Sequence, residues 1–201
     1  MAKKTKKQAK VKFNTEFWQK LVSNRTSHLV VGLSLIGLSL FSFLAFISYY
    51  YNWTSDQSLV QQGFGTMITQ PEVKAENLLG KLGAALGHQL IFLGFGLGAF
   101  LWSWLAFVIG LRLSLALKVF SLKKAIASSL FFMLWIPTLL AYFFPDYGQL
   151  AGSTGYWLEN WSNSLMGPVG TIVVLIFLLF SFLAIRFQLT SDKILSAIKI
   201  F

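Results

Sequence analysis

The stretch from residue 82 to residue 111 reads LGAALGHQLIFLGFGLGAFLWSWLAFVIGL. It holds thirty residues between Lys81 and Arg112 without one formal charge. A helix needs about 20 predominantly apolar residues to cross roughly 30 Å of hydrocarbon, so this stretch is long enough to span a membrane. One Asp, Lys or Arg at mid-span would cost about 2.5–3.5 kcal/mol, which explains why the charges stand at its two edges.

Three further windows have the same character, and each is bounded by charged side chains: 26–55, 125–145 and 160–185. The chain of 201 residues is only 12% charged and 55% hydrophobic, whereas soluble domains carry about 25% charged residues. This composition excludes a soluble enzyme. It predicts an all-α membrane protein with four transmembrane helices, at about 29–50, 89–111, 125–144 and 167–185.

The basic side chains gather on one predicted side of the membrane. Fifteen of the 17 Lys and Arg residues fall in the N-terminal segment, the second connection or the C-terminal segment. Only Lys74 and Lys81 fall in the other two connections, which hold five of the seven acidic residues. Because short cytoplasmic loops collect Lys and Arg, we expect both termini in the cytoplasm. The Lys-rich segment 2–12 fits topology and anionic lipid better than nucleic acid, since no nucleic-acid-binding motif accompanies it.

The chain divides into three predicted parts. Residues 1–25 form a polybasic tail with an interfacial amphipathic helix that begins at Asn14, residues 26–187 form the four-span domain, and residues 188–201 begin a cytoplasmic linker. The first outer connection is expected to return to helix over 72–88. A second short helix, over 153–165, is expected on the outer membrane surface, and its Trp157 and Trp161 form a candidate contact surface.

The second span is unusually rich in glycine. Gly83 with Gly87, and Gly94 with Gly98, have the small-xxx-small spacing that lets two helices approach closely in lipid. The candidate helix-packing or assembly residues are therefore Gly80, Gly83, Gly87, Gly94 and Gly98. The spacing leaves open whether they pack within one chain or between copies.

Ionisable chemistry is missing from the predicted spans, although such residues usually mark proton relays and ion pathways. His28 and His88 lack the partners of a metal site, the chain has no Cys, and no Gly-x-x-x-x-Gly-Lys-Ser/Thr loop occurs. We expect no catalytic residue, cofactor or metal, and no enzymatic activity. A small four-helix transporter or channel subunit stays an alternative, because a polar pore needs no acidic coupling residue.

Several motifs in fixed order carry a family resemblance. They are the sequence SYYYNWTSDQS at 48–58, the Asn-x-x-Gly-x-x-Gly-Ala entry to the second span, the Gly-Leu-Arg exit at 110–112, and AGSTGYWLENWSNSLMGPVGTIVVL at 151–175. The entry motif consists of Asn77, Gly80, Gly83 and Ala84. From about Leu29 to Thr190 the chain resembles the N-terminal four-transmembrane-helix domain of the FtsK/SpoIIIE DNA translocase family.

The resemblance implies a membrane-anchoring and assembly module of a cell-division DNA translocase, itself non-catalytic. It implies chromosome segregation at the division septum, in the bacterial inner membrane. The implied partners are the lipid bilayer, further copies of the chain (a hexamer in the family) and other cell-division membrane proteins, with no direct nucleic-acid contact. In the family the motor lies beyond a cytoplasmic linker, so a chain that stops at Phe201 is expected to be the anchor without its motor.

Overall fold

The computed structural model describes residues 24–70, 72, 74–115 and 121–188, and within these ranges it contains helices and no strand. Their order along the chain is α2 (Arg25–Gln61), α3 (Phe64–Thr69), α4 (Gly80–Gly87), η1 (His88–Phe95), η2 (Gly96–Gly98), α5 (Ala99–Leu115), α6 (Leu122–Phe143) and α7 (Gly148–Phe187). The predicted interfacial helix from Asn14 and most of the predicted linker lie outside the described residues.

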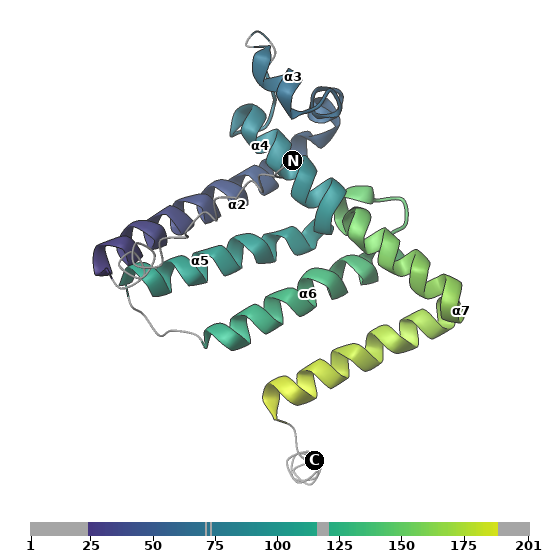
Figure 1. Cartoon of the computed structure of the whole chain (residues 1–201). Coiled ribbons are helices and arrows are strands. Elements are labelled where there is room, and N and C mark those ends of the chain that lie inside the picture. The colour runs from purple at the N-terminus through teal and green to yellow at the C-terminus, as the bar shows by residue number, and fades with distance from the viewer. Residues whose placement is uncertain (1–23, 71, 73, 116–120, 189–201) are drawn as a thin grey trace, which may run out of the picture.

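Within the described ranges, four helical stretches are long and apolar enough to cross a membrane: Arg25–Gln61, Gly80–Leu115, Leu122–Phe143 and Gly148–Phe187. The predicted four-span fold is thus confirmed. Helix α2 packs against α5, α5 against α6, and α6 against α7, and Figure 1 shows the four running side by side.

Charge divides the two ends of this arrangement. The start of α2, the end of α5, the start of α6 and the end of α7 lie at the same end (Figure 1). We call it the basic end, because it carries Arg25, Arg112, Lys123, Lys124 and Arg186. The opposite end, called the acidic end, carries Asp56 near the end of α2, Glu159 in the first part of α7, and Glu72, Glu76 and Asp146 in the connections.

The first outer connection differs from the sequence expectation of a helix over 72–88, which is wrong at its start. Residues 74–79 are non-helical and α4 begins only at Gly80. The reason is side-chain competition for the backbone. The Asp56 carboxylate accepts the backbone N–H groups of Glu76 and Asn77 at 2.7 and 3.0 Å, and the Asn77 side chain accepts the N–H of Leu79 at 3.0 Å. These bonds hold the segment as turns.

The second span is broken rather than continuous. After α4 the chain passes through a π-helical segment, η1, and a short 3-10 segment, η2, before α5 begins. Gly94 leaves helical geometry at φ −106° and ψ −118°, and Gly96 has φ 53° and ψ −131°. A side chain would make the Gly96 conformation strongly unfavourable, because φ is positive there. The span expected at about 89–111 falls within the membrane-crossing stretch Gly80–Leu115, and the break inside it was not anticipated from the sequence.

Helix α7 is broken too, at Gly152 (φ 63°, ψ 171°) and Gly167 (φ 72°, ψ 169°). Its first part, up to residue 166, lies across the acidic end of the bundle, and its second part runs beside α6 (Figure 1). The short helix expected over 153–165 falls between the two breaks. Pro137, by contrast, lies inside α6, which continues through it to Phe143.

The main core cluster lies where α2 crosses the broken span. Ala45, Phe46 and Tyr49 of α2 are buried against Ile91 and Ala99. The Phe46 ring meets that of Phe100 edge to face, with centroids 5.6 Å apart, an arrangement that aromatic pairs favour. Nearby, the Ser39 hydroxyl donates to the carbonyl of Ser103 at 2.8 Å. Apolar packing and an interhelical hydrogen bond together join the first two spans.

Candidate functional site

Three of the five predicted packing glycines are covered by other parts of the same chain. A Cβ atom at Gly83 would overlap the side-chain oxygen of Asn77, and one at Gly87 would lie 2.7 Å from the Tyr49 ring. A Cβ atom at Gly98 would lie 2.7 Å from the carbonyl oxygen of Met133 in α6. These residues make close contacts with three different partners inside the chain.

The other two predicted glycines do different things. Gly94 sits at the break itself, where a Cβ atom would lie 3.0 Å from the carbonyl oxygen of Gln89. Gly80 has a φ of +61° and open space around it, and it begins α4. Because the helix is interrupted between Gly87 and Gly98, the five do not form one continuous helical face.

The sequence analysis did not predict the close backbone contact between the broken second span and the broken helix α7. A Cβ atom at Gly96 would overlap the carbonyl oxygen of Leu150, and one at Gly152 would overlap the backbone nitrogen of Gly96 and lie 2.5 Å from the carbonyl oxygen of Gly94. Here backbone touches backbone. We call Gly94, Gly96, Leu150 and Gly152 the glycine junction. The glycines were visible in the sequence, but their positive φ angles were not.

The polar backbone exposed by the breaks finds partners around the junction. The Ser153 hydroxyl donates to the carbonyl of Phe92 at 3.2 Å, and the Tyr50 hydroxyl donates to the carbonyl of Gln149 at 2.8 Å. Such bonds are needed because broken helices at membrane depth are tolerated only where protein or water satisfies the freed groups. Tyr50 thereby links α2 to α7 next to the junction.

A second glycine contact joins α6 to the same region. A Cβ atom at Gly155 of α7 would lie 2.5 Å from the carbonyl oxygen of Pro137. Proline lacks the N–H that would bond the carbonyl four residues earlier, which belongs to Met133, and this carbonyl is the one that Gly98 approaches. Pro137 thus marks the point where η2, α6 and α7 meet.

At the acidic end, a buried polar cluster fixes the outer connection. Asp56 and Asn77 are only 2% and 3% exposed. The Asn77 amide donates to the carbonyl of Ala45 at 3.0 Å, and the Ser48 hydroxyl accepts the N–H of Leu78 at 2.8 Å. Lys81 donates to the carbonyl of Met67 at 2.9 Å and to that of Gln70. Asn77, the first residue of the family's entry motif, is the centre of this network.

The predicted outer contact residues lie on the first part of α7. The Trp157 and Trp161 rings are stacked, with centroids 6.4 Å apart and planes 10° from parallel, and they are 65% and 52% exposed. Trp161 also lines a pocket of about 360 Å³ between α6 and the two parts of α7. The pair is available for contact with a partner or with lipid headgroups.

In the described ranges, no three His, Cys, Asp or Glu side chains lie close enough together to hold a metal ion. The structure combines close helix crossings at glycines, an outer connection held by hydrogen bonds to Asp56, and the exposed pair Trp157 and Trp161. Four apolar helices joined in this way define a multi-pass α-helical membrane domain.

The particular family follows from comparison. The chain belongs to the family described as the 4TM region of DNA translocase FtsK/SpoIIIE, whose model matches residues 24–199. The resemblance drawn from the motifs is therefore confirmed. No curated protein and no solved structure matches the chain.

Proposed function

We propose that this chain is the membrane-anchoring and assembly module of a cell-division DNA translocase, acting in chromosome segregation at the septum of the bacterial inner membrane. The observation that carries the proposal is the family match over residues 24–199, on a chain with four apolar helices long enough to span a membrane. In this proposal the chain is non-catalytic, binds no cofactor, and leaves the ATP-driven work to a motor outside these 201 residues.

Orientation links the anchor to that motor. The basic end carries five of the described cations, and Lys and Arg are retained on the cytoplasmic side. With the basic end inside, α2 begins and α7 ends on the side of the membrane where DNA is found. A motor attached after α7 then meets its substrate without any nucleic-acid contact by the membrane domain.

Assembly is the second half of the role. When copies of the chain associate in one membrane, the motors attached to them are held close together. Their effective concentration for assembly is therefore high. The proposed partners are further copies of the chain, as a hexamer, and other cell-division membrane proteins. The exposed pair Trp157 and Trp161 is the candidate contact surface on the outer side. More than half of the surface of each residue stays exposed, although the two rings stack on each other.

The experiment is a fluorescent fusion of residues 1–201, imaged in dividing cells of the source organism and counted by stepwise photobleaching. We expect a band at the septum and spots that hold several copies. A matched fusion carrying Trp157→Ala and Trp161→Ala should keep its membrane insertion and lose septal enrichment. An even distribution of single copies around the membrane would contradict the proposal. Saturable solute flux through liposomes that contain the purified chain would instead support the four-helix transporter or channel.

A further inference from the structure

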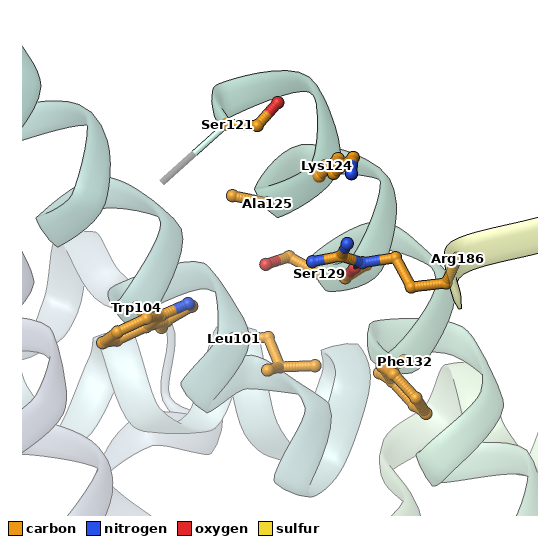
Figure 2. A pocket seen from close by; sticks show the side chains of 9 residues that line it. Leu101, Trp104, Ser121, Lys124, Ala125, Ser129, Phe132 and Arg186 are labelled. Carbon is orange, nitrogen blue, oxygen red and sulfur yellow. Dashed lines mark hydrogen bonds between the residues drawn. The ribbon is translucent and has the colours of Figure 1, made fainter. Parts of the chain in front are cut away.

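A pocket of about 280 Å³ lies at the basic end, between α5, α6 and the last turn of α7. Helix α5 contributes Leu101 and Trp104, α6 contributes most of the lining, and α7 contributes Arg186. In Figure 2, Arg186 reaches from α7 toward Ser129, with Lys124 above it and Leu101 and Phe132 below it.

Among the described residues, those that line the pocket carry positive charge and include no carboxylate. Residues 82–145 and 160–191 contain no Asp or Glu, so α5, α6 and the second part of α7 bring Lys124 and Arg186 to the pocket without any carboxylate. Arg186 donates to the hydroxyl of Ser128 at 3.3 Å, which is a neutral partner. Guanidinium and ammonium groups in this setting favour an anion with several oxygen acceptors, such as a phosphate.

The apolar side chains of Leu101 and Phe132 line the deeper part of the pocket, below Arg186 in Figure 2. Along α6 the lining runs from Ser121 to Phe132, which at 1.5 Å per residue is about 16 Å. This depth covers one headgroup and the upper part of its acyl chains, and it is about half of the roughly 30 Å hydrocarbon thickness. Trp104, 46% exposed, lines the α5 side of the pocket together with Leu101. The pocket is thus graded from cationic to apolar within one leaflet.

We propose that this pocket binds the headgroup of an anionic phospholipid from the leaflet at the basic end. Lys124 and Arg186 contact the phosphate, the hydroxyls of Ser121 and Ser129 donate further hydrogen bonds, and the acyl chains lie against Leu101 and Phe132. Basic pockets between transmembrane helices are known to hold such headgroups. The apolar depth selects a lipid over free phosphate. A lipid held in this way bridges α5, α6 and α7 at the end of the bundle opposite to the outer connections.

The test is a lipid titration of the purified full chain in detergent, followed by native mass spectrometry. Phosphatidylglycerol is compared with phosphatidylcholine for the wild type, Lys124→Gln, Arg186→Gln and the double variant. The matched control is Lys123→Gln, which removes the same charge from the adjacent residue, exposed and outside the pocket lining. Arg186→Lys, which keeps the charge, serves if Arg186→Gln does not fold by circular dichroism.

We expect the wild type to retain phosphatidylglycerol in preference to phosphatidylcholine. Each pocket substitution should weaken phosphatidylglycerol binding about tenfold and the double substitution roughly 100-fold, since a hydrogen bond to a charged group contributes about 1.5 kcal/mol. Lys123→Gln should bind like the wild type. Equal losses in Lys123→Gln and Lys124→Gln would overturn the proposal, because they would show diffuse surface attraction. Displacement of the lipid by excess inorganic phosphate alone would overturn the lipid assignment in favour of a small phosphate ligand.

Discussion

Replacing Gly152 by Ala tests the glycine junction directly. The residue has φ 63° and ψ 171°, a region that essentially only glycine occupies, and residues forced into such regions cost about 1–3 kcal/mol. The new Cβ atom would also overlap the backbone nitrogen of Gly96 and lie 2.5 Å from the carbonyl oxygen of Gly94. Overpacking of this kind costs about 1–3 kcal/mol more. We therefore expect a loss of roughly 2–6 kcal/mol in the free energy of unfolding.

Two control substitutions separate these contributions. Gly167 has nearly the same dihedral angles, φ 72° and ψ 169°, but no atom within 4 Å of its Cβ position. Gly167→Ala should therefore show the backbone strain alone, about 1–3 kcal/mol. Gly37 lies on an exposed face of α2 with open space around it, so Gly37→Ala should be neutral or stabilise by up to about 1 kcal/mol through helix propensity.

The assay is reversible unfolding in mixed micelles with increasing SDS, followed by circular dichroism. We expect Gly152→Ala to be the most destabilised variant, followed by Gly167→Ala and then Gly37→Ala. Equal losses for Gly152→Ala and Gly167→Ala would refute the backbone-to-backbone contact, because that contact is the difference between the two sites.

Three further changes have clear expected outcomes. Gly87→Leu should lower the unfolding midpoint of the chain even when it is diluted to single copies, because the side chain would meet the Tyr49 ring within the chain; a change in oligomer size at unaltered stability would contradict this. Asp56→Asn should speed hydrogen exchange at the amides of residues 76 and 77 and cost about 1–3 kcal/mol, since the new NH₂ faces an N–H donor; unchanged exchange would contradict the network. In the cysteine-free chain, Ser58→Cys should react with impermeant maleimide from outside whole cells and Lys123→Cys only after lysis, and the reverse pattern would invert the proposed topology.

The sequence predicted the four spans because a charge-free window is a direct consequence of the membrane. It also separated the basic from the acidic connections. The same criterion could not place the helix ends: α2 continues past the predicted end at Tyr50 to Gln61. A charge such as that of Asp56 is compatible with helix beyond the hydrocarbon, where its carboxylate accepts two backbone N–H groups.

The helix breaks could not be predicted for a different reason. Glycine both permits close packing and permits positive φ, so the run from Gly94 to Gly98 is equally suited to a smooth packing face and to a break. Which of these occurs depends on Gly152, more than fifty residues away, whose backbone occupies the space that the break opens. The signal lies in the pairing of two glycine segments, and a single local pattern does not contain it.

The two ends of the domain are held by different means. Near the acidic end, the glycine junction and the Asp56 network join α2, the broken span and α7. Toward the basic end, the second part of α7 packs mainly on α6, through stacked Phe131 and Phe182 rings 4.1 Å apart and a hydrogen bond from Trp135 to the carbonyl of Leu175 at 2.9 Å. The most apolar stretch of α7 is only 11% buried, against 39% for the second span. In lipid an uncovered apolar face has no solvation cost, so the low burial does not destabilise the helix. Contacts within the chain therefore restrain the second part of α7 less than the other spans. Its position in the membrane depends most on the lipids and proteins around it.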